Sequence, residues 1–293
     1  MKILLTGTAG LIGSAVAREL LAAGHEVRAL DKMPPRDDLR SMNIEMVYAD
    51  ITDRLSVLRA AEGCQAIAHL AAIPNPMHGA DRLTEVNVCG TQYILEAAEA
   101  NAVERVVLAS SASIYGMPFA RHAFEPDYLP MDEDHPCRPQ DVYALSKLCN
   151  EEAAATYTRR AGITTVCLRP PMVLEIGGHR ARWQRRMLRG AGDYKSNDMW
   201  TYLDVRDAAR AFRLGLEVPL EGHHRLLLAA RDSWTREDIR VLVRRHYPNL
   251  ASFVEHLNAE ASLYNTQKAE EVLGFVPQYS WRDVAELNDE SDV

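Results

Sequence analysis

The sequence has no apolar run that approaches the roughly 20 residues needed to cross a bilayer, so no membrane partner is expected. It also has no room for a signal peptide, because a strand-like segment begins at Lys2. We therefore expect a soluble, cytoplasmic protein. Basic residues are few: 33 Lys and Arg stand against 41 Asp and Glu, a formal net charge of −8. A negative protein repels phosphate backbones, so nucleic acid is not an expected partner.

Cysteine is too sparse and too scattered for a disulfide framework. The five cysteines are odd in number and include no C-x-x-C pair, so neither cross-links nor a zinc site is indicated. The histidines do not indicate a metal site either, because no carboxylate or thiol lies at a metal-ligand spacing from His69 or from the pair His223 and His224. We predict no metal site and structural roles for these histidines.

Short β-branched apolar segments alternate with longer segments of helical period over the first 170 residues. The expected strands are Lys2–Thr6, Glu26–Asp31, Glu45–Ala49, Ala66–Leu70, Arg105–Ser110 and Thr164–Arg169, and the expected helices are Leu11–Ala23, Arg54–Ala61, Asp81–Asn101 and Val142–Ala161. The strands are apolar throughout, as in a parallel sheet that helices cover on both faces. The pattern predicts an α/β protein with a Rossmann-type, doubly wound parallel sheet.

Two changes of composition interrupt this alternation. Residues Met117–Asp141 are rich in Pro, Asp and Glu and have no regular period, which predicts a long functional loop. After Pro170 the alternation weakens, and the expected elements are a strand near Trp200–Leu203, a helix over Val205–Leu216, a strand near Arg225–Ala229 and a helix that opens at Thr235. We predict an NAD-binding domain over residues 1–170 and a smaller C-terminal substrate-binding lobe over residues 171–293, interleaved with the main sheet.

A glycine-rich turn, G-T-A-G-L-I-G over residues 7–13, joins the first strand to the first helix. Gly7 permits a tight turn, Gly10 lets the backbone approach a pyrophosphate, and Gly13 lets the helix pack against the strand. The helix N-terminus then offers unpaired N–H groups and a positive dipole end to the phosphates. This context favours dinucleotide binding over an ordinary strand-to-helix turn.

Carboxylates at the ends of the next two strands bear on the choice of cofactor. Asp31 ends the second strand, where it can accept hydrogen bonds from the adenine-ribose hydroxyls and would repel a ribose phosphate. This favours NAD, although Lys32 and Arg36 are near enough in sequence to leave NADP open. The pair Asp50 and Ile51 ends the third strand and is expected to face the adenine, with a surface turn as the alternative.

The helix expected after the acidic loop begins with Y-A-L-S-K, which places Tyr143 and Lys147 one turn apart on one face. A free tyrosine, with a pKa of about 10, is a poor base unless a neighbouring ammonium and a positive nicotinamide favour the phenolate. Upstream, S-S-A-S-I-Y-G over residues 110–116 follows the end of a strand, the edge at which open α/β sheets bind ligands. A hydroxyl there can hold a substrate oxygen while Tyr143 exchanges its proton. The alternatives are a surface ion pair and a serine turn that satisfies its own backbone.

Together these motifs resemble the extended short-chain dehydrogenase/reductases, and within them the NAD-dependent epimerase/dehydratase family, which includes sugar epimerases and uronate dehydrogenases. The resemblance covers most of the chain. Besides the motifs above, it is carried by H-L-A-A (69–72), N-V-C-G-T (87–91), L-P-M-D-E-D (129–134), L-R-P (168–170) and Y-L-D-V-R-D (202–207). It implies that Ser111 contacts the substrate hydroxyl, that Tyr143 is the acid/base, and that Lys147 holds the ribose and lowers the pKa of the tyrosine.

The resemblance also implies a cofactor site. The residues expected to contact NAD are Gly7, Gly10, Leu11, Ile12, Gly13, Asp31, Asp50, Ile51, Leu70, Ala71, Ala72, Asn87, Ser110, Tyr143, Lys147 and Pro170. Asn87 would lie on the helix that borders the nicotinamide, and residues 70–72 would line the ribose side of the cofactor.

Arginines gather after the last strand of the first domain, at positions 180, 182, 185, 186 and 189. On a helix the last four would share one face, which makes a cradle for a carboxylate or phosphate or, as the alternative, a solvated face. With Ser111 and Ser113, the residues Arg180 and Arg182 are therefore the expected contacts of a substrate that carries a negative charge.

Two departures from the family pattern narrow the reaction. Family dehydratases carry an Asp-Glu pair directly after the hydroxyl residue, whereas Ala112 and Ser113 stand there, so elimination is disfavoured. The segment from Pro171 to Met199 is shorter than in nucleotide-sugar enzymes, which puts recognition of a nucleotide diphosphate in doubt and leaves room for a smaller sugar or sugar acid.

The favoured function is NAD-dependent epimerisation of a sugar or nucleotide sugar through a transient ketone. The alternative is a sugar or uronate dehydrogenase that releases NADH. A non-enzymatic dinucleotide-sensing regulator is disfavoured, because the hydroxyl, the tyrosine and the lysine are all present. By resemblance we also expect a homodimer that pairs the helices over Asp81–Asn101 and Val142–Ala161. The alanines at 153–155 would allow close helix approach between subunits, or burial within one subunit.

Overall fold

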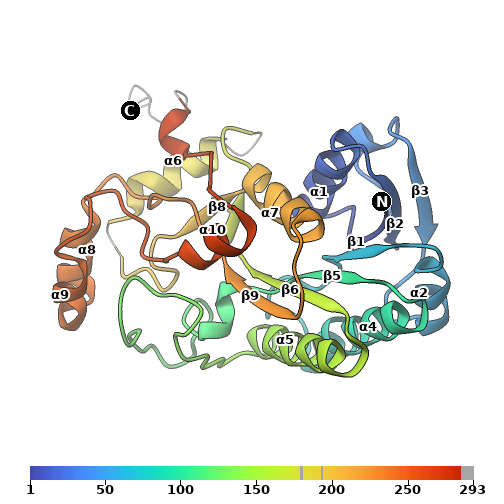
Figure 1. Cartoon of the computed structure of the whole chain (residues 1–293). Coiled ribbons are helices and arrows are strands. Elements are labelled where there is room, and N and C mark those ends of the chain that lie inside the picture. Colours follow the sequence, from blue (N-terminus) through green and yellow to red (C-terminus); the bar gives the residue numbers. More distant parts are fainter. Residues whose placement is uncertain (179–180, 193, 285–293) are drawn as a thin grey trace.

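A parallel sheet forms the centre of the computed structural model, which describes residues 1–178, 181–192 and 194–284 (Figure 1). Its strand order is β3-β2-β1-β4-β5-β6-β9, and every neighbouring pair is parallel. The strands are β1 (Lys2–Thr6), β2 (Glu26–Asp31), β3 (Ile44–Tyr48), β4 (Ala66–His69), β5 (Arg105–Ala109), β6 (Thr164–Arg169) and β9 (His223–Leu227). The order reverses between β1 and β4, the point at which doubly wound sheets bind ligands. The predicted Rossmann-type fold is confirmed.

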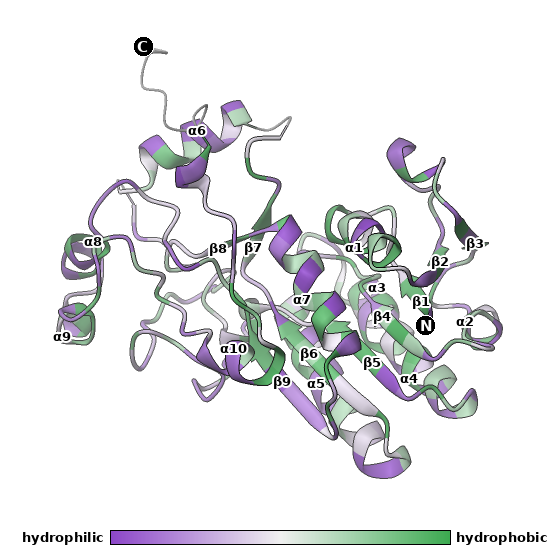
Figure 2. Ribbon diagram, turned by 45° about the horizontal axis from the view of Figure 1, so that its top comes forward, coloured by the Kyte–Doolittle hydropathy of each residue, from purple (hydrophilic) through white to green (hydrophobic). Residues whose placement is uncertain are grey.

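Helices cover both faces of this sheet (Figure 1). One face carries α1 (Leu11–Ala22) and α7 (Val205–Glu217), and the other carries α2 (Arg54–Ala60), α4 (Gly90–Ala100) and α5 (Val142–Ala161). Successive residues of β1 point to opposite faces: Ile3 and Leu5 pack with α1 and α7, whereas Leu4 packs with α2 and α4. Both layers are apolar, and in Figure 2 the central strands are largely green. This is why the strands are apolar at every position.

The predicted helix over Asp81–Asn101 is divided into three segments. These are α3 (Ala80–Leu83), a π-helical turn (Thr84–Cys89) and α4. π turns inside helices are frequent at functional sites, and this turn carries Asn87. The other strands and helices predicted before residue 170 agree with the structure to within one residue at each end.

Residues after Pro170 contribute to both parts of the molecule. β7 (Met172–Leu174) and β8 (Tyr202–Asp204) form a separate parallel pair. In contrast, β9 is the last strand of the main sheet, and α7 packs on one face of that sheet. The predicted strand near Trp200 begins two residues late, because Met199 and Trp200 have φ values of 57° and 51°, a left-handed backbone that a strand cannot contain. The two parts are therefore interleaved, and the boundary at residue 170 stays a prediction.

A second core, apart from the main sheet, includes residues of α6 (Ala181–Gly190), α8 (Ile239–His246) and α9 (Ala251–Val254), whereas α10 (Gln267–Leu273) packs with α7 in the core of the main sheet. The helix predicted to open at Thr235 starts at Ile239 instead, because Asp238 caps it by accepting a hydrogen bond from the Arg240 N–H. The acidic loop Met117–Asp141 contains no strand or α-helix, and it is anchored by Met131, which lies in this second core. Within the described ranges, no helix is both long and apolar enough to cross a membrane.

Candidate active site

The glycine-rich turn between β1 and α1 leaves no space for a side chain at Gly7 or Gly13. Gly7 has a φ of +80°, and a Cβ there would lie 2.7 Å from the backbone nitrogen of Ala71, which follows β4. A Cβ on Gly13 would lie 2.0 Å from the carbonyl oxygen of Gly7. Gly10 caps α1, whose first turn carries no acidic side chain. A backbone-lined turn at a positive helix end fits a dinucleotide pyrophosphate, with the N–H groups of Leu11 and Ile12 available to it.

Asp31 lies against this turn. Its Oδ2 accepts a hydrogen bond from the Ala9 N–H and its Oδ1 from the Met33 N–H, both at 2.9 Å. The carboxylate is thus held at the end of β2, where the sequence predicts the adenine ribose. Nearby, Lys32 Nζ lies 3.3 Å from Asp50 Oδ2. The Lys32 ammonium, which could attract a ribose phosphate, is therefore paired with the Asp50 carboxylate. This pairing favours NAD over NADP.

The pair Asp50 and Ile51 divides its side chains between a turn and the core. Asp50 Oδ1 accepts hydrogen bonds from the N–H and the hydroxyl of Thr52, at 3.1 and 3.0 Å, as in an ordinary Asx turn. Ile51 is 4% exposed and packs against Gly90 of α4, where a Cβ would lie 2.7 Å from Ile51 Cδ1. Contact of this pair with the adenine stays a prediction.

The Thr6 side chain fixes the backbone of the segment after β4. The Thr6 hydroxyl oxygen accepts hydrogen bonds from the N–H groups of Leu70 and Ala71, at 3.2 and 3.1 Å, and residues 70–72 are partly exposed. The ring of His69 is fixed between Thr6 and Thr91, at 2.8 and 2.9 Å. Burial, together with the nearby lysine ammonium, lowers the pKa of His69 to about 3, so the ring is neutral and structural.

Asn87 supports this segment from the π turn. Its Oδ1 accepts a hydrogen bond from the Ile73 N–H at 2.8 Å, and its Nδ2 donates to Ile73 O and Ser146 Oγ, both at 3.1 Å. Both amide hydrogens are committed to the protein itself. The geometry shows that Asn87 supports the segment after β4, and its direct contact with NAD stays a prediction.

Ser111, Tyr143 and Lys147 come together where β5 ends. Lys147 Nζ lies 5.8 Å from the centre of the Tyr143 ring and donates a hydrogen bond to Ala109 O at 2.7 Å. Ser111 begins a 3-10 turn, and its Oγ accepts the Ser113 N–H at 3.1 Å. The Ser111 side chain also acts on Tyr143, because it lowers the pKa of the phenol. The three residues predicted to be catalytic therefore converge.

Burial sets the protonation of these groups. It lowers the pKa of Lys147 to about 8. It also raises the pKa of Tyr143, because a phenolate here would lose its hydration, and the Ser111 side chain opposes this effect in part. That the lysine favours the phenolate stays a prediction. The positive nicotinamide ring is the further charge that can favour the phenolate.

The neighbours of Ser111 point in different directions. The Ser110 hydroxyl donates to Glu151 Oε1 at 2.5 Å, and contact of Ser110 with NAD stays a prediction. Pro170 is buried, and its carbonyl oxygen accepts the Ala112 N–H at 3.0 Å. The Ser113 hydroxyl is buried and has no hydrogen-bond partner within the described ranges. This supports Ser113 as a substrate contact.

Of the predicted arginine cradle, Arg180 lies outside the described residues. Arg182 is exposed on α6, whose buried side includes Gln184 and Leu188. This exposure fits the solvated face that the sequence left as an alternative, and contact of Arg182 with the substrate stays a prediction.

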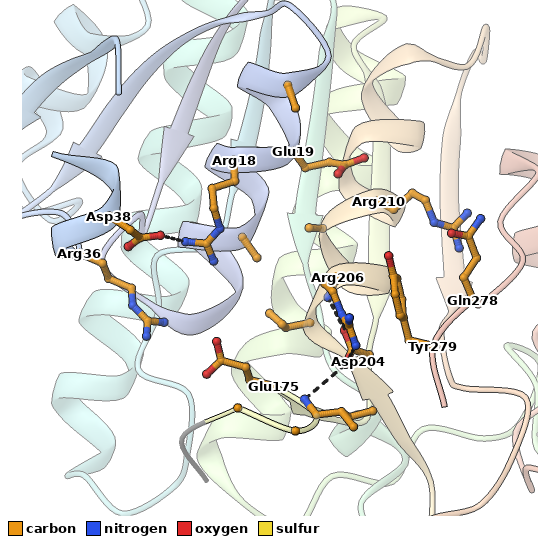
Figure 3. Close-up of a pocket in the computed structure, with 17 residues that line it drawn as sticks. Arg18, Glu19, Arg36, Asp38, Glu175, Asp204, Arg206, Arg210, Gln278 and Tyr279 are labelled. Carbon is orange, nitrogen blue, oxygen red and sulfur yellow. Dashed lines mark hydrogen bonds and ion pairs between the residues drawn. The ribbon is translucent and has the colours of Figure 1, made fainter. Parts of the chain in front are cut away.

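A groove of about 780 Å³ lies between α1 and α7 (Figure 3). Arg18 pairs with Asp38 on one side, Arg206 lies 3.7 Å from the centre of the Tyr279 ring on the other, and Arg36 points into the groove. The groove is lined by four arginines and four acidic residues, so its charge does not select for an anion. None of the three converging residues lines it, which separates it from the catalytic site.

The sequence analysis assigned no role to three residues at the site. The half-exposed Phe119, from the acidic loop, packs edge-on against Tyr143 with ring centres 6.2 Å apart. Glu151 and Arg169 form a buried ion pair behind Ser110. A signal for Glu151 was present, because it follows Lys147 at the same spacing of four that joins Lys147 to Tyr143.

The chain is similar to known proteins over most of its length. The model of the NAD-dependent epimerase/dehydratase family matches residues 3–228. A UDP-glucose 4-epimerase of Corynebacterium glutamicum is 25% identical over 96% of this chain and 92% of that protein. A uronate dehydrogenase of Pseudomonas putida is 31% identical over 76% of this chain and 74% of that protein. The solved structure of MoeE5 in complex with UDP-glucuronic acid and NAD has a TM-score of 0.73 and 25% identity, and covers 98% of this chain and 97% of that one.

The family match spans the whole proposed site. It runs from β1 and the glycine-rich turn through the converging residues to the segment just after β9. NAD, the predicted cofactor, is confirmed by the family, and the residues of the turn fit it. This chain belongs to the NAD-dependent epimerase/dehydratase family.

Proposed function

We propose that this protein epimerises a carbinol carbon of a sugar or nucleotide sugar through a transient ketone, with NAD retained. The observation that carries the proposal is the convergence of Ser111, Tyr143 and Lys147 beside a turn shaped for a dinucleotide. Similarity to a UDP-glucose 4-epimerase over 96% of the chain supports epimerisation. The presence of Ala112 and Ser113, where dehydratases carry an Asp-Glu pair, argues against elimination.

Bound NAD supplies a two-electron acceptor beside these residues. Tyr143 takes the proton of the substrate hydroxyl as the carbon is oxidised, and returns it when the ketone is reduced. The Ser111 hydroxyl holds the substrate oxygen against the phenol, and the Lys147 ammonium favours the phenolate and orients the ribose. If the ketone turns before reduction, the electrons return to its other face and the product is the epimer.

A second candidate is a uronate or sugar dehydrogenase, which is favoured by the 31% identity to a uronate dehydrogenase. The same three residues would act, but the lactone or ketone would leave and NADH would be released in each turnover. An anionic sugar suits both candidates, because MoeE5 is solved with UDP-glucuronic acid. We therefore propose sugar acids and their nucleotide derivatives as the first substrates to test.

The test is incubation with NAD and a panel of hexoses, uronic acids, UDP-glucose and UDP-glucuronic acid. We expect isomer formation, seen by chromatography, without steady growth of NADH absorbance. Steady growth of NADH absorbance would establish the dehydrogenase instead.

Tyr143→Phe removes the proton-transferring hydroxyl and keeps the ring that packs against Phe119. We expect turnover to fall by about 100-fold or more, while calorimetry shows NAD binding unchanged. Activity close to that of the wild type in this variant would refute the role of Tyr143.

A further inference from the structure

A buried ion pair lies next to the serine turn, which we define as Ser110 together with the 3-10 turn that Ser111 begins and Tyr115 ends. Arg169 binds Glu151 with two hydrogen bonds, Nε to Oε1 at 2.9 Å and Nη2 to Oε2 at 2.7 Å, and the side chains are 2% and 0% exposed. Desolvating two charges is costly even when they are paired, and apolar side chains of similar volume often hold such elements together as well or better. Stability is therefore a poor explanation for this pair.

The carboxylate of the pair is directed at the turn that carries Ser111, the residue proposed to hold the substrate hydroxyl. Besides Arg169, Glu151 Oε1 accepts the hydrogen bond from Ser110 Oγ at 2.5 Å, and Ser110 directly precedes Ser111. Glu151 lies one helical turn after Lys147 on α5, and Tyr143 lies in the first turn of the same helix. The helix that presents the proposed acid/base thus also holds the backbone that carries Ser111.

The guanidinium of the pair reaches two more segments of the site. Arg169 Nη1 donates to the Tyr115 hydroxyl at 3.2 Å and to Glu133 O, in the acidic loop, at 3.1 Å. Tyr115 ends the 3-10 turn that Ser111 begins, and its hydroxyl donates to Asp132 O at 2.8 Å. One ion pair therefore connects α5, β6, both ends of the serine turn and the acidic loop.

We propose that Glu151 and Arg169 are positioning residues that fix the serine turn, so that the Ser111 hydroxyl stays within hydrogen-bond reach of the Tyr143 phenol. The inference rests on the proposed roles of Ser111 and Tyr143. It has a measurable consequence at the phenol. Burial raises the pKa of Tyr143 and the Ser111 side chain lowers it, so a displaced Ser111 leaves the phenol with a higher pKa.

The other groups around the phenol are not themselves substituted in the proposed variants. Lys147 and Asp141 come from its own helix, and Asp141 acts on the phenol by charge and caps α5. Phe119 comes from the acidic loop, which Arg169 also contacts. A change in the titration of Tyr143 is therefore assigned to Ser111 only where it disappears in the Ser111→Ala background.

The test replaces the pair by apolar side chains, Glu151→Leu with Arg169→Met, so that no unpaired charge is buried. The readout is the ultraviolet titration of tyrosinate, taken as the difference from the same protein carrying Tyr143→Phe, with and without saturating NAD. We expect the pKa of Tyr143 to rise by about as much as it does in Ser111→Ala. The pair variant added to Ser111→Ala should give no further rise. NAD affinity should stay within a few-fold of the wild type.

A matched control is Asp207→Asn, which disturbs another buried carboxylate. Asp207 is 0% exposed, pairs with Arg210 at 2.8 Å and accepts backbone hydrogen bonds from Gln278 and Tyr279. This change should lower the melting temperature and leave the titration of Tyr143 unchanged. A similar rise of the pKa in this control would assign the effect to general loosening and overturn the proposal.

Two further outcomes decide the matter. If the pair variant folds and binds NAD but the titration of Tyr143 does not move, the pair is structural and the proposal fails. If the pair variant does not fold, Ser110→Ala deletes only the hydroxyl that reaches Glu151, and an unmoved titration there has the same meaning. Failure of Ser111→Ala itself to move the titration would instead refute the assignment of Ser111 in the proposed function.

Discussion

Lys147 is the converging residue whose protonation is changed strongly by its surroundings. It is buried beside Tyr143, and this burial lowers its pKa from 10.5 to about 8. A lysine in water keeps its charge at neutral pH with ease, whereas this one holds it against desolvation. The protein therefore retains a destabilising group at the site, as is common for catalytic residues.

The sign of this effect gives a stability prediction for Lys147→Met. Between about pH 8 and pH 10.5 the folded lysine is neutral while the unfolded one still binds a proton, so wild-type stability rises with pH across this range. At pH 7 the shift corresponds to about 3 kcal/mol, and the methionine variant should be the more stable protein by up to that amount. Urea unfolding at several pH values should show that the stability difference between the methionine variant and the wild type shrinks toward pH 10.5.

The exposed Lys268 on α10 provides the control, because its replacement by methionine relieves no burial. A stability difference that does not change with pH in Lys147→Met would contradict the prediction. Turnover should be lost in Lys147→Met and kept in Lys268→Met.

At the scale of elements, the site depends on the close approach of α1 to the turn that precedes it. The carbonyl of Gly7 occupies the space where a side chain at position 13 would begin. The same turn packs against the segment after β4, which is held by Thr6 and supported by Asn87 through Ile73. A small displacement of α1 would therefore disturb both the phosphate and the ribose ends of the cofactor site.

Gly13→Ala should abolish measurable NAD binding, because its Cβ would lie 2.0 Å from the Gly7 oxygen. We also expect the protein to lose about 1 to 3 kcal/mol of stability, as for other overpacked positions. Gly190→Ala at the end of α6 is the control, since no atom lies within 4 Å of a Cβ there. Calorimetry with NAD and thermal melts test both variants, and intact NAD binding in Gly13→Ala would contradict the packing argument.

At the scale of the whole molecule, the outer face of α5 is the surface that the family resemblance assigns to a dimer. Ala154 and Ala155 do not lie on it, because both are buried within the chain, as the sequence left open. Leu145, 49% exposed, and the exposed Cys149 lie one turn apart on that outer face. We propose a homodimer through this face, in which each residue of the interface would be used twice by symmetry.

Light scattering should therefore give twice the mass of the chain for the wild type and once that mass for Leu145→Arg. Val241→Arg on α8, an exposed apolar position of similar exposure, should remain dimeric. A monomeric wild type would exclude the proposed dimer, and a dimeric Leu145→Arg would place the interface elsewhere.

Much of the fold and the core of the site could be predicted from the sequence. The strands, α1, α5 and the glycine-rich turn depend on periodicity and on turn chemistry within a few neighbouring residues. The same holds for the one-turn spacing of Tyr143 and Lys147. The prediction was less accurate where a local pattern competed with backbone geometry, as at the left-handed Met199 and Trp200 and in the π turn that divides the helix before α4.

By itself, the sequence determined the parallel sheet, the glycine-rich turn predicted to bind a dinucleotide and the identity of the three converging residues. Only the tertiary structure decided which polar groups are paired with one another: Asn87 with Ile73, Ser110 with Glu151, and Glu151 with Arg169. The reason is that these partners lie 14 to 41 positions apart in the chain. Their pairing depends on which elements become neighbours on folding, and a pattern of nearby residues carries no information about that.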